Sequence, residues 1–219
     1  MRSASLVLHT LCLAVTATAA ALAAQADPDK NVAGGGALPA GWHAHTERNA
    51  PLAALKFVSM GDGYHATMGP AAIFWRDADS VTGEYRTVAT FTQTKAPMHP
   101  EAYGLIVGGQ HLADSAQSYT YFLVRGDGMY SIRRRQGYAN RPTAIVEWTA
   151  NDAVNKADSA GRATNELGVT VKGGRVRFLI NGKDVYSAAA ADGDTKGTVG
   201  YRVNHNLDVH LTPIEVHRL

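Results

Sequence analysis

Short runs of alternating apolar residues, separated by glycine and asparagine turns, constrain the fold of this chain more than any other feature of its sequence. Gly173-Gly174 is a two-residue hairpin turn that sets Val169 opposite Phe178, so apolar side chains meet. Asn181-Gly182 is the pair that a type I′ turn favours, and it sets Val185 opposite Phe178. Because successive side chains of a strand point to opposite faces, this phase predicts which face packs in the core.

About ten such runs follow one another along the chain, bounded by Gly, Asn, Asp and Pro. One stretch has a helical pattern, because Thr149 and Asp152 resemble a capping pair ahead of residues 153–157. A single short helix cannot form a layer of a domain. We therefore predict an all-β sandwich or barrel with at most one short helix.

The turn at Gly126-Asp127-Gly128 decides which polar side chains share a face. A two-residue loop would set Val124 against Ser131, whereas a three-residue loop sets Val124 against Tyr130 and Phe122 against Ile132. We prefer the three-residue loop because it keeps apolar residues together. By alternation, it puts two tyrosines and three arginines on one face away from the core. These residues are Tyr119, Tyr121, Arg125, Arg133 and Arg135.

The first 26 residues have the composition of a secretory signal peptide. Eighteen of them are apolar, Arg2 is the only charged residue, and Ala24-Gln25-Ala26 forms a small-residue cleavage pattern. We expect cleavage after Ala26, with cleavage after Ala24 as the alternative, a flexible leader over 27–40 and one domain over 41–219. The expected location is therefore secreted or periplasmic.

Composition excludes several classes of function. The only cysteine, Cys12, lies in the predicted signal peptide, so we expect no disulfide and no cysteine nucleophile in the mature chain. Without Arg2, the 20 basic and 19 acidic residues balance, which argues against nucleic acid as a partner. No later segment approaches the roughly 20 apolar residues of a membrane span. No phosphate loop or dinucleotide fingerprint appears, and we expect no cofactor.

From Asn165 to Leu219, the order of short motifs resembles the C-terminal half of concanavalin A-like lectin and glucanase domains. The motifs are Asn-x-Leu-x-Val, Gly-x-x-Val-x-Phe-x-Ile-Asn-Gly, Gly197-x-x-Gly200-Tyr201-Arg202-Val203 and a closing strand over 209–219. Laminin-G-like modules and 3-keto-disaccharide hydrolase-like domains share this order. The resemblance implies a two-sheet antiparallel jelly-roll β-sandwich whose concave face often binds saccharides.

The glucanases of this fold carry a Glu-x-Asp-x-(x)-Glu strand that supplies nucleophile and acid, and this chain has no such triplet. Glu84, Glu101 and Glu147 each stand without a carboxylate two or four residues away. A retaining glucanase needs two carboxyl groups about 5 Å apart. The sequence therefore favours binding of a saccharide over lichenase-like or laminarinase-like cleavage.

We predict a carbohydrate-binding domain that recognises a poly- or oligosaccharide on its concave sheet, and the mix of tyrosines and arginines suits a polyhydroxylated or anionic sugar. Tyrosine rings offer apolar faces to sugar C–H groups, and guanidinium groups donate hydrogen bonds to hydroxyl or carboxylate oxygens. To the five residues of the predicted face we add Arg202 and Asn204, which point outward if Tyr201 and Val203 face the core. The alternative is an exposed strand face on which arginine stems cover tyrosine rings and nothing binds.

A second hypothesis is a glycoside-cleaving enzyme similar to 3-keto-disaccharide hydrolase-like domains. The loop over 94–104 carries His99 and Glu101 beside two prolines, and a rigid loop of this kind can present an acid/base pair. The simpler interpretation is a proline-braced turn with a solvated or paired glutamate. A third hypothesis is a non-catalytic adhesion or structural module of the cell envelope that contacts protein through a sheet edge.

His205, Asp208 and His210 raise the question of a zinc site. Strand alternation separates His205 from His210, and no third fixed ligand is apparent. We therefore expect a hydrogen-bonded turn here and no metal.

Overall fold

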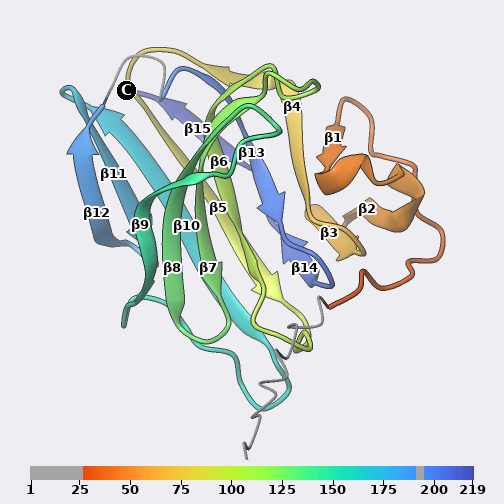
Figure 1. Ribbon diagram of the computed structural model, residues 1–219. Coiled ribbons are helices and arrows are strands. Elements are labelled where there is room, and N and C mark those ends of the chain that lie inside the picture. Colours follow the sequence, from red (N-terminus) through yellow and green to blue (C-terminus); the bar gives the residue numbers. More distant parts are fainter. Residues whose placement is uncertain (1–26, 191–194) are drawn as a thin grey trace, which may run out of the picture.

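The computed structural model describes residues 27–190 and 195–219, so the predicted signal peptide over 1–26 lies outside the described residues. Two antiparallel sheets pack face to face (Figure 1), which confirms the predicted all-β, two-sheet sandwich. The seven-stranded sheet has the order β1 (His43–Thr46), β4 (Ala72–Val81), β13 (Gly197–Val203), β6 (Ala102–Gln110), β7 (Ser118–Arg125), β8 (Met129–Gln136) and β9 (Thr143–Ala150). The eight-stranded sheet has the order β12 (Lys183–Ala189), β11 (Arg175–Ile180), β10 (Ala163–Lys172), β5 (Tyr85–Gln93), β14 (Asp208–Leu211), β3 (Gly63–Met68) and β2 (Leu55–Met60), and β15 (Glu215–Arg218) also pairs with β5.

Helix is confined, in the described part of the chain, to two three-residue 3-10 turns, η1 (Glu47–Asn49) and η2 (Leu52–Ala54). The helical turn predicted over 153–157 is wrong. Oδ1 of Asn151 accepts a hydrogen bond of 2.8 Å from the Ala153 N–H and closes a turn there, because asparagine side chains compete with helical hydrogen bonds. Among the described residues, no helix is long and apolar enough to cross a bilayer.

Two of the predicted hairpin registers are confirmed. Val169 pairs with Phe178 across β10 and β11, and Phe122 pairs with Ile132 across β7 and β8. The third differs, because the pairing of β11 with β12 shifts between Phe178 and Leu179 and sets Phe178 opposite Tyr186 instead of Val185. A β-bulge of this kind inserts one residue and moves every later pair by one position.

The core lies between the two sheets and is rich in aromatic rings. Phe57 and Phe74 stack at 4.4 Å, Trp42 stacks on Tyr201 at 5.3 Å, and Phe122 is fully buried. Each such ring stabilises the fold by about 1.5–3 kcal/mol through burial. A second apolar cluster covers the outer face of the seven-stranded sheet: Ile73, Trp75, Ala102, Ile106, Leu112, Tyr119, Tyr121 and Leu123.

The segment predicted as a flexible leader, 27–40, packs against the domain. The Lys30 N–H donates to Oδ1 of Asn206 at 2.7 Å, and the Lys30 ammonium pairs with the Asp208 carboxylate at 2.5 Å. Gly36 N–H donates to the Leu55 carbonyl at 3.2 Å. These partners of Lys30 lie more than 170 residues away in sequence, so no local pattern indicates the contact.

Candidate functional site

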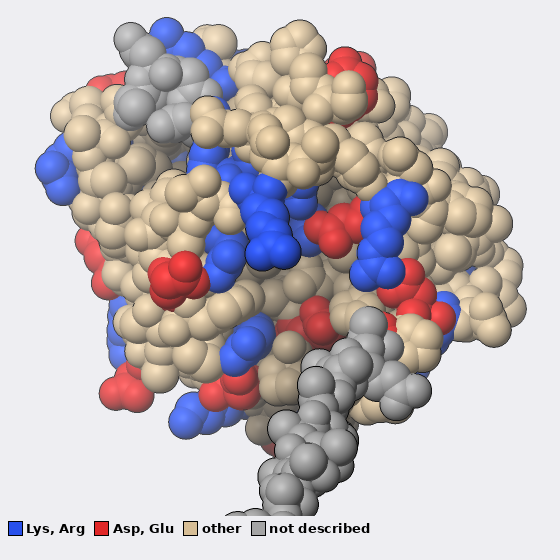
Figure 2. Space-filling view, in the orientation of Figure 1, with Lys and Arg blue, Asp and Glu red and all other residues tan. Residues whose placement is uncertain are grey.

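The outer face of the seven-stranded sheet carries the candidate site. Figure 2 shows this face hollowed in its middle, with Lys and Arg side chains gathered beside Asp and Glu around the hollow. The strands β7 and β8 bring the predicted residues to this face, since Tyr121 pairs with Arg133 and Tyr119 pairs with Arg135 in the predicted register. All five residues predicted from the three-residue loop therefore share this face.

Tyr119 and Tyr121 are more buried than the sequence indicates. Tyr119 is 2% exposed and Tyr121 is 6% exposed, and burial raises the pKa of the Tyr121 phenol. The guanidinium of Arg202 lies 5.2 Å from the centre of the Tyr121 ring. Arg135 is also buried and donates to the Tyr138 carbonyl at 3.0 Å. These residues are packed into the outer face of the sheet rather than forming an open stacking platform.

One end of this face, which we call the tryptophan end, consists of Arg125, Arg133, Glu147 and Trp148. The Arg125 guanidinium lies 4.5 Å from the centre of the Trp148 ring and pairs with Asp127. Arg133 donates to Oε2 of Glu147 at 2.7 Å. The sequence did not predict Trp148 on this face, because strict alternation along β9 puts Trp148 on the same side as Val146, which packs against the core. Bulges in the pairing of β8 with β9 change this phase and turn Trp148 toward the outer cluster.

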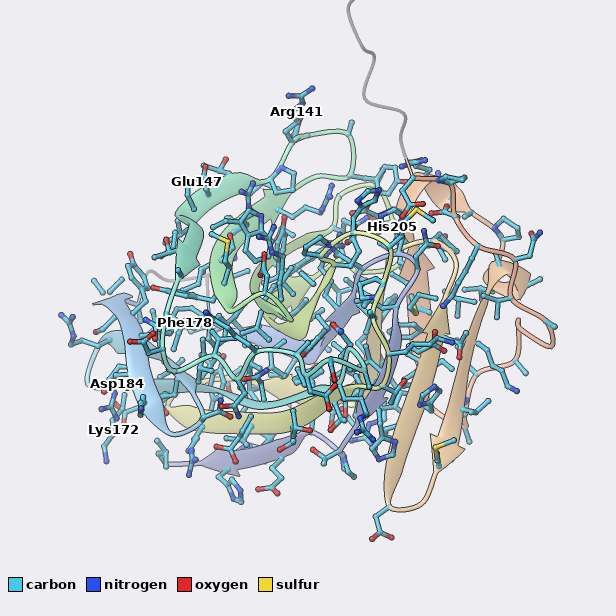
Figure 3. The ribbon with its side chains drawn as sticks, turned by 90° about the horizontal axis from the view of Figure 1, so that it is seen from below. Arg141, Glu147, Lys172, Phe178, Asp184 and His205 are labelled. Carbon is cyan, nitrogen blue, oxygen red and sulfur yellow. The ribbon has the colours of Figure 1, made fainter. Side chains whose placement is uncertain are left out.

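The other end is a pocket of about 240 Å³, which we call the end pocket. It forms where η1, the leader, and the ends of β6 and β13 meet. Its lining consists of Asp29, Glu47, Arg48, Pro70, Ala71, Glu101, Arg202, Asn204 and His205. Figure 3 shows His205 at this end, in the turn after β13, and Glu147 away from it on the edge strand β9. The predicted outward direction of Arg202 and Asn204 thus brings both into one pocket with Glu101.

In the end pocket, the buried Arg202 forms an ion pair with the partly exposed Glu47. Nη2 of Arg202 donates to Oε1 of Glu47 at 2.5 Å, and the Arg202 side chain is 8% exposed. The Arg202 guanidinium lowers the pKa of the Glu47 carboxyl, against the opposing effect of burial. Arg135 approaches the same carboxylate at 3.5 Å. Glu47 is therefore held ionised.

His205 joins two carboxylates in the end pocket. Its Nε2 lies 2.8 Å from Oε1 of Glu101, and its Nδ1 lies 3.2 Å from Oδ1 of Asp29. Asn204 donates to the other oxygen of Glu101 at 3.1 Å. Because the two carboxylates sit on different nitrogens of one ring, they do not converge on a common point. No group of three or more His, Cys, Asp or Glu residues within 27–190 and 195–219 could hold a metal ion.

The structure does not bring His99 and Glu101 together. His99 is exposed and lines a neighbouring hollow with Met98, whereas Glu101 is directed into the end pocket and contacts His205. Of the rejected zinc set, His205 lies apart, because its ring contacts Glu101 and Asp29, whereas Asp208 and His210 both lie on β14.

No family model and no curated protein matches the sequence. Solved structures match the fold. The carbohydrate binding module CBM66 from Bacillus subtilis superposes with a TM-score of 0.57 at 11% identity, over 86% of this chain and 99% of that one. The chain has a concanavalin A-like fold. A galectin-like protein of unknown function from Bacillus subtilis gives 0.54 at 11% identity, over 81% and 89% of the two chains. The exoplasmic/lumenal domain of VIP36 with Ca²⁺ and Man3GlcNAc bound gives 0.53 at 9% identity, over 82% and 84%.

At identities this low, these superpositions establish the fold alone. The ligand has to be argued from the side chains of this chain.

Proposed function

We propose that this chain is a secreted or periplasmic carbohydrate-binding module that holds an oligo- or polysaccharide along the hollow from Trp148 to the end pocket. The observation that carries the proposal is the alignment, on one sheet face, of a half-buried tryptophan stacked under Arg125 with a polar pocket at the other end. The composition of residues 1–26 supports export.

The chemistry of the hollow suits a sugar chain. An indole ring offers an apolar face to sugar C–H groups, and guanidinium and carboxylate groups hydrogen-bond hydroxyls in fixed directions. Concave sites that combine an apolar surface with a few placed polar groups are the usual form of small-molecule sites. Two of the structures with this fold are a module named for carbohydrate binding and a lumenal domain with bound Man3GlcNAc, which adds support.

Cleavage is less well supported than binding. A general acid needs a carboxyl whose pKa is raised, whereas the pKa of Glu47 is lowered by Arg202. Both oxygens of Glu101 already contact His205 or Asn204. We therefore propose that these carboxylates orient hydroxyl groups and do not transfer protons to a glycosidic oxygen.

The test is binding of the exported chain to a panel of polysaccharides by affinity electrophoresis, with Trp148→Ala, Trp148→Phe and Arg141→Ala compared. Trp148→Ala should weaken binding about tenfold, or about 1.4 kcal/mol, because the stacking surface is lost. Trp148→Phe should retain most of the affinity. Arg141 lies on the β8–β9 loop and points away from the sheet (Figure 3), so Arg141→Ala should bind like the wild type.

Wild-type protein that binds no sugar at millimolar concentration would refute the proposal, as would binding that Trp148→Ala leaves unchanged. Capture of an envelope protein by a chain that binds no sugar would favour the adhesion hypothesis instead.

A further inference from the structure

We infer that the hollow is built for an uncharged saccharide and excludes uronic-acid polymers. This inference rests on the proposed function and names its ligand class.

The arginines of the tryptophan end are each neutralised by a carboxylate. Arg125 pairs bidentately with Asp127 at 3.1 and 2.5 Å, and Arg133 pairs with Glu147 at 2.7 Å. The bidentate pair occupies one fork of donors on Arg125, and the bond from Arg133 to Glu147 offsets the charge of that guanidinium. A uronate approaching either arginine at this end would meet a carboxylate beside it and be repelled.

The cationic groups toward the end pocket also contact carboxylates. Arg202 and Arg135 share the carboxylate of Glu47, and His205 lies between Glu101 and Asp29. Among the described residues, the end pocket and the ion pairs named above contain five arginines and five carboxylates. The arginines are Arg48, Arg125, Arg133, Arg135 and Arg202, and the carboxylates are Asp29, Glu47, Glu101, Asp127 and Glu147. The lining therefore offers no net positive charge to an anionic chain.

The paired carboxylates retain the acceptor capacity that hydroxyl groups need. Each ionised carboxylate offers about four lone-pair sites, and the arginine or histidine contact uses only one or two of them. Glu147 is 75% exposed and Glu47 37% exposed, so their remaining lone pairs are open to a ligand. A hydroxyl can donate to such an oxygen, whereas the carboxylate of a uronate can only accept and would be repelled.

The size of the end pocket agrees with a single ring. Its volume of about 240 Å³ is below the roughly 300–1,000 Å³ of pockets that enclose drug-sized ligands. We therefore place one uncharged sugar residue in the end pocket and the neighbouring residues of the chain along the outer face of the sheet toward Trp148.

The experiment compares neutral polymers (galactomannan, mixed-linkage β-glucan and arabinan) with polygalacturonate and alginate, at 50 and 500 mM NaCl. The wild type should bind a neutral polymer at least tenfold more tightly than either polyuronate, with little change between the two salt concentrations. Glu147→Gln should unmask Arg133, weaken neutral binding about three- to fivefold and create polyuronate binding that 500 mM NaCl suppresses.

The matched control is Asp184→Asn. Asp184 is half exposed and pairs with Arg177 at 3.4 Å, but it lies on β12 of the other sheet (Figure 3). Asp184→Asn removes one negative charge, as Glu147→Gln does, but away from the hollow, so polyuronate binding should not appear.

Salt-sensitive polyuronate binding by the wild type, abolished by Trp148→Ala, would overturn the inference and leave the proposed function standing. Equal gains of polyuronate binding in both variants would overturn it too, because net charge alone would explain them. Absence of binding to every polymer by the wild type would overturn the proposed function itself.

Discussion

The side-chain amide of Asn181 donates a hydrogen bond of 2.9 Å to Oδ1 of Asn165, which joins a hairpin turn to the start of β10. Asn165 is fully buried and also bonds both the N–H and the carbonyl of Asn155, at 2.7 and 3.1 Å. Oδ1 of Asn181 accepts a hydrogen bond of 2.8 Å from the Glu166 N–H. These two asparagines therefore fix the hairpin of β11 and β12 and the loop after β9 to one point of the sandwich.

We expect Asn165→Leu to destabilise the protein by about 2–4 kcal/mol, because it removes a fully buried amide and leaves its partners on Asn155 and Asn181 unpaired. Urea denaturation measures the loss. Asn140→Ala is the control, since Asn140 is exposed and makes its bond, to the Gln136 carbonyl, at the surface. Equal losses in the two variants would show that Asn165 is not a structural hub.

Glu47→Gln should cost about 2–3 kcal/mol at pH 7, because Arg202 is left buried without its charge partner while the partly exposed carboxylate limits the loss. The pKa of Glu47 is lowered in the folded state, so its contribution is present above the unfolded pKa near 4.3 and is lost as pH falls through the folded value. The difference between wild type and variant should therefore persist from pH 7 to about 4.5 and shrink below it.

Unfolding free energies from urea titrations at pH 3 to 7 test this dependence. Glu147→Gln, whose carboxylate is 75% exposed, serves as control and should change stability by less than about 1 kcal/mol at every pH. A Glu47→Gln deficit that stays constant down to pH 3 would contradict the role assigned to the ion pair.

Lys30 and Lys95 both contact the Asp208 carboxylate, at 2.5 and 3.0 Å, and the Asp208 side chain is 8% exposed. Lys30→Met or Lys95→Met alone should cost about 1 kcal/mol or less, because the remaining lysine still pairs with the buried carboxylate. The double variant should lose about 3 kcal/mol or more, since the carboxylate is then buried without a cation. Additive losses in a double-mutant cycle would rule out this sharing.

Gly161→Ala should destabilise the fold by about 2–5 kcal/mol. Gly161 has a φ of 78°, and a Cβ there would lie 2.0 Å from the backbone nitrogen of Ala96. Gly173 has a φ of 58° with no atom near its Cβ position, so Gly173→Ala should cost only the left-handed backbone term of about 1–2 kcal/mol. Thermal unfolding of the two variants separates the clash from the backbone term, and equal shifts would contradict a tight contact between the 94–101 and 151–162 loops.

The arrangement of β7 and β8 could be predicted because a tight turn and an apolar period of two act over a few residues. The three-residue loop at Gly126–Gly128 correctly sets Phe122 in the core and Tyr121 on the outer face. The same reasoning failed at Val185, because a bulge arises from how two strands coil against the rest of the sheet and leaves no sign in the turn.

The candidate site was likewise predicted in part. Alternation alone assigned Tyr119, Tyr121, Arg125, Arg133 and Arg135 to one face, and it directed Arg202 and Asn204 outward. It could not show that the tyrosines are buried, that Trp148 joins the face, or that Arg202 meets Glu47 from 155 residues away. Side-chain direction is a property of a single strand and is written in the local sequence. Burial and charge pairing depend on which distant segments the curved sheets bring together, and only the tertiary structure decides that.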